Sequence, residues 1–140
     1  MTYQVTIGEV ERQWIAAARG PMRKDVSAAM LALLDQAWKF VRENGVPTDG
    51  QNLAIYRSDR IEAGPRVLAP FEGCTATPSG LAASVVHMGP YELLGQAHTA
   101  ILEWCAANGH EIEGTNWEIY GHHEEDPARR RTDVYYLLRS

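Results

Sequence analysis

The sequence predicts an α+β fold in which two β-α-β-β repeats, related by a pseudo-twofold axis, form an antiparallel sheet with two helices on one face. Two observations carry this prediction. Segments 44–56 and 108–120 resemble each other at a constant offset of 64 residues, and each follows a stretch with the periodicity of an amphipathic helix. Strands and helices do not alternate regularly along the chain, which argues against a doubly wound α/β fold.

The internal repeat is the stronger observation. NGVPTDGQNLAIY (44–56) and NGHEIEGTNWEIY (108–120) are identical at six of thirteen positions. Upstream, the Gly-Pro pairs at 20–21 and 89–90 precede the two helical stretches at an offset of 69, so the first stretch is about five residues longer. We therefore expect one domain over residues 1–140, with repeat one at about 1–73 and repeat two at about 80–140.

Helices are expected near 22–44 and 91–108, where apolar residues recur at spacings of three and four. The first stripe comprises Val26, Met30, Leu33, Ala37, Phe40 and Val41, and the second comprises Tyr91, Leu94, Ala97, Ile101, Trp104 and Cys105. An Asn-Gly pair follows each stripe, at 44–45 and 108–109, and glycine readily adopts the left-handed conformation that ends a helix.

Strands are expected where β-branched and aromatic residues cluster between turn signals. They cover residues 2–7, 10–18, 51–58, 66–71, 81–88, 115–121 and 132–138. Gly8-Glu9 is a candidate turn between the first two strands, and residues 73–80 (GCTATPSG) form the loop that joins the repeats.

Composition narrows the class of protein. Hydrophobic residues make up 45% of the chain and charged residues 22%, which is typical of a globular protein. Thirteen basic against 18 acidic residues give a net charge of −5, so we expect no direct nucleic-acid partner. No apolar run approaches the roughly 18 residues of a membrane span, and the N-terminus lacks the apolar core of a signal peptide. These features predict a cytoplasmic protein with two free thiols, at Cys74 and Cys105.

The two repeats differ at one informative position. Residues alternate between the faces of a strand, so Ala54 and Glu118 occupy equivalent places, each between an Asn and a Tyr on one face. The opposite face carries Leu53, Ile55, Trp117 and Ile119, which suits packing under a helix. A carboxylate in the middle of a strand costs free energy unless water or a partner compensates it. Glu118 is therefore either a solvated strand residue or the centre of an aromatic-walled cleft that holds a cation or polar ligand.

Several short motifs of the second half occur in the order and spacing of a known family. They are His87-Met88-Gly89-Pro90-Tyr91, Ile101-Leu102-Glu103-Trp104, Gly114-Thr115-Asn116-Trp117-Glu118-Ile119-Tyr120 and Thr132-Asp133-Val134-Tyr135-Tyr136-Leu137. With these motifs the chain resembles the gyrase-inhibitor-like (GyrI-like) small-molecule-binding domain, the effector-binding module of AraC- and MerR-type regulators of multidrug response. Residues 81–140 carry the resemblance. The first half shares it only through the repeat and lacks a Tyr after Gly20-Pro21.

The resemblance implies a ligand cleft between the repeats, in which a strand carboxylate meets cationic or amphipathic aromatic compounds. Glu118 matches that carboxylate, and Tyr91 and Tyr120 match aromatic positions near the cleft. The expected ligand-binding residues are Glu118, Tyr120, Tyr91, Asn116, Trp117 and Tyr56. The leading function is small-molecule binding without a cofactor, by a stand-alone sensor, sequestering protein or regulatory effector-binding protein.

Two alternatives belong to other functional classes. Some members of the family that the chain resembles hydrolyse strained cyclopropane-type electrophiles. In that function Glu118 is the catalytic residue, and Trp117 or Tyr120 orients the substrate. The family name also implies inhibition of DNA gyrase by protein contact, so a regulator or gyrase is the candidate protein partner. The sequence leaves the oligomeric state open.

The remaining histidines and acidic residues do not show the spacing of a metal site. Residues 122–126 (HHEED) are expected to form a polar hairpin loop before the arginines at 129–131, and no metal is expected. His87 and His98 are either general bases or, as is more common, hydrogen-bonded structural residues.

Overall fold

The computed structural model describes residues 2–139, which form a curled antiparallel sheet with two helices. The strand order is β1-β7-β9-β8-β4-β5-β2-β6, and β3 also pairs with β5. The strands are β1 (Thr6–Val10), β2 (Trp14–Ile15), β3 (Ala18–Pro21), β4 (Thr48–Tyr56), β5 (Arg60–Val67), β6 (Thr75–Ala76), β7 (Gly80–Met88), β8 (Ile112–Tyr120) and β9 (Arg131–Leu138). Two short 3-10 turns, η1 (Tyr91–Leu93) and η2 (Pro127–Arg129), complete the second half.

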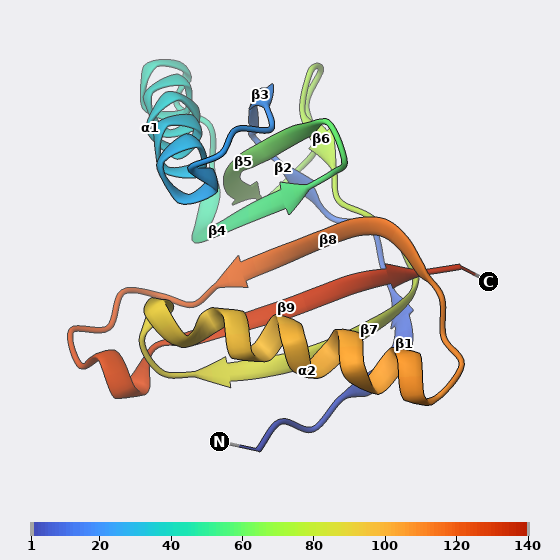
Figure 1. Ribbon diagram of the computed structural model, residues 1–140. Coiled ribbons are helices and arrows are strands. Elements are labelled where there is room, and N and C mark those ends of the chain that lie inside the picture. Colours follow the sequence, from blue (N-terminus) through green and yellow to red (C-terminus); the bar gives the residue numbers. More distant parts are fainter. Residues whose placement is uncertain (1, 140) are drawn as a thin grey trace.

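The strand order repeats itself around the seam between β4 and β8. In the first half the order is β3-β5-β4, and in the second it is β7-β9-β8, so each half is a β-α-β-β unit. At the seam Ala54 lies opposite Glu118. These two residues are also equivalent in the repeat, 64 positions apart. The pseudo-twofold axis therefore passes through this pair, and the predicted repeat architecture is confirmed (Figure 1).

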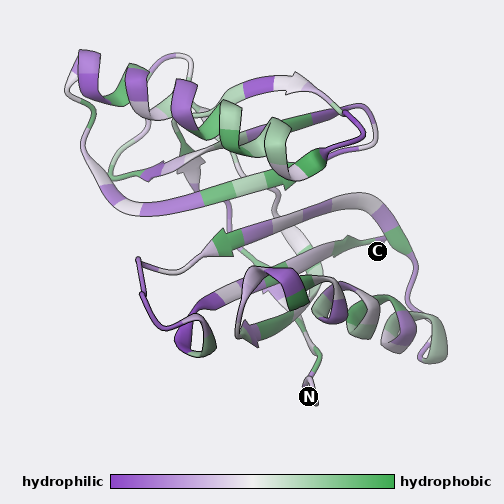
Figure 2. Cartoon of the chain, turned by 60° about the vertical axis from the view of Figure 1, so that its left-hand side comes forward, coloured by the Kyte–Doolittle hydropathy of each residue, from purple (hydrophilic) through white to green (hydrophobic). Residues whose placement is uncertain are grey.

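The two helices have the predicted ends and start slightly later than predicted. Helix α1 (Val26–Asn44) begins where the Asp25 carboxylate accepts a hydrogen bond from the N–H of Ala28 at 3.0 Å. It ends at Gly45, which has a φ of 61°. Helix α2 (Leu94–Ala107) follows η1, and Gly109 just beyond it has a φ of 75°. Figure 2 shows hydrophobic and hydrophilic segments alternating along both helices, as amphipathic helices require.

Both helices pack on the sheet face that carries Ala54 and Glu118. Helix α1 lies mainly against β5 and β3, and α2 lies mainly against β7 and β9. Under α2 the core consists of Ala83, Val85, Ala97, Ile101, Cys105, Val134 and Leu138. Under α1 the buried residues are Leu33, Ala54, Ile61 and Ala63. Neither helix lies mainly on the two central strands, β4 and β8, and this arrangement positions the site described below.

The prediction that the strand face with Leu53, Ile55, Trp117 and Ile119 packs under a helix is wrong. Leu53, Ile55 and Trp117 lie on the other face of the sheet, where they pack with Ile15 of β2 and with Ala82. Ile119 is partly buried at the same cluster. The sheet is covered on both sides because the segment around β2 crosses the face opposite the helices, so hydrophobicity alone does not distinguish the two faces.

The strands of the first half have other bounds than predicted. The strand expected at 2–7 is β1, at Thr6–Val10, and the single strand expected at 10–18 is replaced by β2, at Trp14–Ile15, and β3, which begins at Ala18. Gly8 and Glu9 do not form a turn, because both lie inside β1 and pair with β7. The strand expected at 66–71 is β5, at Arg60–Val67, and it contains the pair Gly64-Pro65, which resembles a turn signal. Gly64 is required there because a Cβ atom at this position would lie 1.9 Å from the carbonyl oxygen of Ala16.

Cys105 is buried under α2 and Cys74 is partly exposed, and both have free thiols. The helices formed by residues 2–139 include none with the length and apolar character that crossing a bilayer demands.

Candidate ligand-binding site

A cavity of about 770 Å³ lies over the seam between the two repeats. Its floor comes from β4 and β8, and its walls come from α1 on one side and from η1 and the start of α2 on the other. The cavity exists because each helix packs mainly on the outer strands of its own half and leaves the central strands uncovered. The lining residues are Val26, Ser27, Met30, Leu31, Leu34, Gly50, Asn52, Tyr56, Tyr91, Leu94, Gly95, His98, Asn116, Glu118, Tyr120, Gly121, His122 and His123.

Glu118 lies at the centre of the floor, on the pseudo-twofold axis, and is only 5% exposed. Its Oε1 accepts hydrogen bonds from the Tyr120 hydroxyl at 2.5 Å and from the Tyr56 hydroxyl at 3.3 Å. Its Oε2 lies 2.6 Å from Nε2 of His98. Within residues 2–139, His98 is the sole basic side chain within ion-pair distance of the Glu118 carboxylate. Glu118 is therefore buried with good hydrogen bonds and without a permanently charged partner.

The phenols beside Glu118 stay protonated. Burial, and next the negative charge of Glu118, raise the pKa of Tyr56 above its ordinary value of 10. The same two causes, in the same order, hold the pKa of Tyr120 well above 10. Both hydroxyls therefore donate to the carboxylate over the whole physiological pH range. They satisfy Oε1 of Glu118 but supply no positive charge.

His98 bridges α2 to the sheet. It follows the buried Ala97 on α2, and its Nδ1 lies 2.7 Å from the hydroxyl of Tyr136 on β9, with the two rings edge to face at 5.5 Å. Burial and the charge of Glu118 raise the pKa of Tyr136 to about 12. The repeat-equivalent of His98 is Leu34, which also lines the cavity. One half thus contributes the polar pair His98 and Glu118, and the other contributes Leu34 and Ala54 at the same places.

Tyr91 stands at the mouth of the cavity and is 47% exposed. Its ring meets the ring of Tyr120 edge to face at 6.2 Å, and the guanidinium carbon of Arg130 lies 5.4 Å from the Tyr91 ring centroid. The ring already holds one cation on its surface, which is the interaction that an organic cation would make with an aromatic wall.

Solved structures share this architecture, although no protein-family model and no curated protein sequence matches the chain. The C-terminal domain of EcmrR superposes with a TM-score of 0.83 at 19% identity, over 100% of this chain and 99% of that domain. The chain has the GyrI-like fold. It spans 58% of the EcmrR chain in a structure of an EcmrR–DNA complex, so EcmrR has further sequence outside this fold.

Two other proteins with this fold are informative. SAV2435, in a structure bound to tetraphenylphosphonium, gives a TM-score of 0.62 at 8% identity, over 100% of this chain and 95% of that one. A hydrolase from Listeria innocua gives 0.63 at 10% identity, over 97% of this chain and 92% of that one. At these identities the GyrI-like fold is shared, and the ligand and the activity belong to those proteins.

Five of the six residues expected in the site line one cavity: Glu118, Tyr120, Tyr91, Asn116 and Tyr56. Trp117 does not. It is 1% exposed on the opposite face of β8, where it stacks on Tyr135 at 5.1 Å. Strand alternation places neighbours on opposite faces, so Trp117 cannot share the cavity with Glu118.

Three groups of lining residues lie outside the predicted site. The first is His98, for which the sequence is compatible with either a general base or a structural residue. The second is the wall of α1, where Met30 and Leu31 face the cavity and Leu31 is 56% exposed. The third is His122 and His123, which lie in the loop expected between β8 and β9 but at the rim of the cavity. Residues 2–139 contain no group of three His, Cys, Asp or Glu side chains arranged to hold a metal.

Proposed function

We propose that this protein binds lipophilic organic cations in the cavity, with Glu118 as the counter-charge. The observation that supports this most strongly is a buried carboxylate whose neighbours are two phenols and an imidazole rather than a lysine or arginine. Structural buried carboxylates are normally paired with a cation, because an uncompensated charge in a low-dielectric site is costly. A ligand that brings the missing positive charge removes this cost.

The shape and lining of the cavity are suited to an aromatic cation. Its volume of about 770 Å³ is within the range of small-molecule sites. Tyr91, Tyr56 and Tyr120 offer aromatic surfaces, and α1 offers an apolar wall. The Glu118 oxygens already accept three hydrogen bonds, so few lone pairs are left for a ligand N–H group. This favours cations that donate no hydrogen bond, such as the tetraphenylphosphonium that SAV2435 binds.

We further propose that the protein acts as an effector-binding or sequestering protein for such compounds. Any effect on transcription then passes through a protein partner that binds DNA, because a net charge of −5 does not favour contact with phosphates. The EcmrR domain supports this proposal by its fold, since EcmrR also forms a complex with DNA.

Titration with tetraphenylphosphonium tests the proposal. Glu118→Gln keeps the side-chain shape and removes the charge, and loss of a partly desolvated ion pair costs about 2–5 kcal/mol, or roughly 30-fold or more in affinity. Triphenylphosphine oxide, a neutral compound of similar shape, should lose much less affinity in the same variant. Glu113→Gln on the exposed end of β8 is the matched control and should bind like the wild type. Equal affinity of the wild type and Glu118→Gln for the phosphonium contradicts the proposal.

Hydrolysis is the second candidate function, and the 2.6 Å contact between His98 and Glu118 favours it. A carboxylate–imidazole pair can accept a proton from an attacking water, and Tyr120 is close enough to orient a substrate at Glu118. We rank it below binding because both ring nitrogens of His98 are already hydrogen-bonded. Mass spectrometry of a strained cyclopropane electrophile incubated with the protein separates the two functions. Multiple turnovers that Glu118→Gln abolishes indicate a hydrolase, and an intact compound indicates a binding protein.

A further inference from the structure

We propose that His98 makes cation binding proton-coupled: an organic cation and the second proton of the His98 ring compete for the single carboxylate of Glu118. This inference rests on the proposed function and adds a specificity-determining residue to it. It is carried by the geometry of one side chain that reaches from α2 to the floor of the cavity, and by the asymmetry between the two repeats.

The first step is the contact itself. His98 Nε2 lies 2.6 Å from Glu118 Oε2, and the side chains of the two residues are 22% and 6% exposed. Among residues 2–139, the imidazole of His98 is therefore the only group within ion-pair distance of the Glu118 carboxylate that can gain a positive charge. At this distance and burial, a charge on the imidazole acts strongly on Glu118 because water screens it poorly.

The second step concerns the other ring nitrogen. His98 Nδ1 lies 2.7 Å from the Tyr136 hydroxyl, which can either donate or accept a hydrogen bond. With a neutral ring, the phenol donates to Nδ1 and the ring N–H donates to Glu118. With a charged ring, both nitrogens donate and the phenol oxygen accepts. The pocket around His98 thus accommodates both charge states without rearrangement of the side chains.

The third step is that few other groups can set the charge of the cavity. Of the titratable side chains that face His98, Glu118 comes from β8 and Tyr136 from β9. The phenols of Tyr56 and Tyr120 also face Glu118, and burial raises the pKa of both above 10, so they are neutral near pH 7. Helix α1 contributes only Val26, Ser27, Met30, Leu31 and Leu34, none of which titrates. His122 and His123 are exposed residues of the rim.

The repeat supports a specific role for the pair. Leu34 and Ala54 occupy the equivalent positions of the first half, so the same architecture is built there without either polar group. His98 is therefore not needed to join a helix to this sheet. Its presence opposite Glu118, and only in the half that carries the carboxylate, points to a function in the chemistry of the cavity.

The consequence follows from linkage. When His98 is protonated, the pair is neutral overall and an arriving cation meets a like charge beside its counter-ion. When His98 is neutral, the full charge of Glu118 is free for the ligand. Binding of a cation therefore releases a proton, and by reciprocity the affinity for the cation falls as the pH is lowered. Release of one proton per cation corresponds to a tenfold change in affinity per pH unit, in the range where the imidazole titrates.

Isothermal titration calorimetry of tetraphenylphosphonium tests this between pH 5.5 and 8.5, in pairs of buffers with different ionisation enthalpies. We expect the affinity of the wild type to rise with pH, by up to tenfold per unit, with release of up to one proton. His98→Gln retains an N–H donor toward Glu118 but cannot be protonated, so its affinity should be nearly constant above pH 6. His110→Gln is the matched control because His110 stacks on Trp104 outside the cavity, and it should behave like the wild type. Neutral triphenylphosphine oxide should bind without proton release.

The outcomes are distinguishable. If His98→Gln keeps the pH dependence of the wild type, another group is responsible and the inference is wrong. If the wild type binds the cation with no pH dependence, the inference is wrong and the proposed function stands. If the wild type binds no cation at any pH, both are wrong. Should His98→Gln fail to fold, NMR of the wild-type ring gives the same answer: added cation must lower the fraction of protonated His98 at fixed pH, and an unchanged fraction overturns the inference.

Discussion

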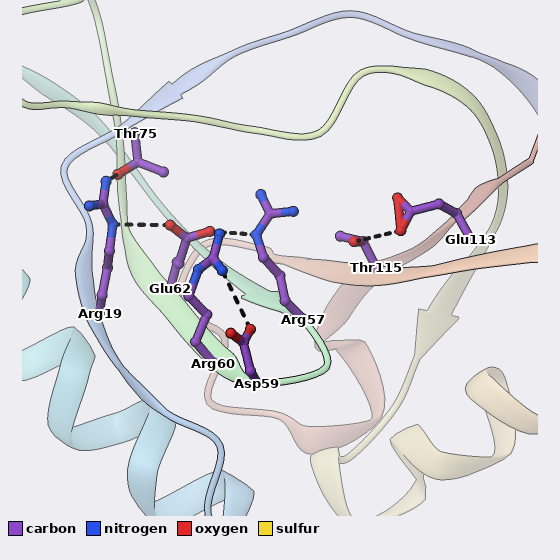
Figure 3. Close-up of polar contacts among 8 residues, drawn as sticks. All are labelled: Arg19, Arg57, Asp59, Arg60, Glu62, Thr75, Glu113 and Thr115. Atoms are coloured by element: carbon purple, nitrogen blue, oxygen red, sulfur yellow. Dashed lines mark hydrogen bonds and ion pairs between the residues drawn. The ribbon is translucent and has the colours of Figure 1, made fainter.

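Two glutamates are buried to almost the same extent on opposite faces of this sheet, and their surroundings differ in kind. Glu62 on β5 is 3% exposed and Glu118 on β8 is 5% exposed. Glu62 receives two guanidinium groups, from Arg57 at 2.8 Å and from Arg19 at 3.0 Å, and Arg19 also donates to Thr75 at 2.8 Å (Figure 3). Glu118 receives two phenols and one imidazole.

The difference separates a carboxylate that the protein itself compensates with permanent positive charges from one that it does not. A guanidinium is charged at every pH at which the protein folds, so Glu62 is compensated permanently and has no charge left for a ligand. Around Glu118 the donors are two phenols and an imidazole, so no permanently charged group compensates this carboxylate. Because both glutamates belong to one molecule, the difference between their surroundings cannot come from a different fold or a different overall charge.

Removing the two carboxylate charges one at a time tests whether Glu62 and Glu118 differ in their contribution to stability. Glu62→Gln leaves two arginines facing a neutral amide and should lower the free energy of unfolding by about 2–3 kcal/mol, less than for a fully buried pair because the arginines are partly solvated. Glu118→Gln leaves only hydrogen-bonding neighbours and should change it by less than about 1 kcal/mol. Urea denaturation of both variants measures the effects. Equal losses would mean that Glu118, like Glu62, is primarily a structural residue.

The two arginines of Glu62 are expected to contribute unequally. The side chain of Arg57 is 27% exposed and that of Arg19 is 56% exposed, so water screens the Arg19 contact more. Arg57→Gln should therefore destabilise the protein by about 1–2 kcal/mol, and Arg19→Gln by less than about 1 kcal/mol. Thermal or urea unfolding at low and high salt checks both values. A larger loss for Arg19→Gln would show that its hydrogen bond to Thr75, rather than charge compensation, dominates at this site.

The repeat made much of the fold predictable from the sequence. The Asn-Gly pairs located both helix ends, because a left-handed residue there is a local requirement that a glycine signals. The position of Glu118 was equally visible, since the equivalent Ala54 served as an internal reference. By contrast, β5 was placed wrongly because its Gly64-Pro65 pair exists for a close approach to Ala16, a contact between segments distant in sequence.

The composition of the site was only partly predictable. Alternation along β8 was read correctly, but both faces of that strand are buried, so the sequence could not tell which face the helices cover. The same alternation places Trp117 on the face opposite Glu118, so the prediction that Trp117 lines the site is inconsistent with it and is wrong. The position of the His98 side chain depends on how α2 is rotated about its axis over the sheet, and no local sequence pattern specifies that rotation. One signal was available: the repeat offset of 64 aligns His98 with Leu34, and a histidine opposite a leucine marks the same asymmetry as Glu118 opposite Ala54.

Tyr136, whose hydroxyl contacts the other nitrogen of His98, gives an effect that is seen only in alkaline solution. Burial, and then the charge of Glu118, raise the pKa of Tyr136 to about 12 from its ordinary value of 10. As the pH rises, the unfolded chain loses this proton before the folded protein does, so the stability that Tyr136 contributes is complete below pH 10 and is lost between pH 10 and about 12. The loss is at most roughly 1.4 kcal/mol per pH unit.

Tyr136→Phe removes this titration and should flatten the alkaline limb of the stability profile. In urea denaturation at pH 9, 10 and 11, the wild type should lose about 1 kcal/mol more than the variant between the last two values. The same difference should be smaller in a Glu118→Gln background, because the second cause of the raised pKa is then absent while burial is unchanged. A constant difference between the wild type and Tyr136→Phe at all three pH values would mean that the phenol titrates alike in both states. In that case neither burial nor the charge of Glu118 raises the pKa of Tyr136.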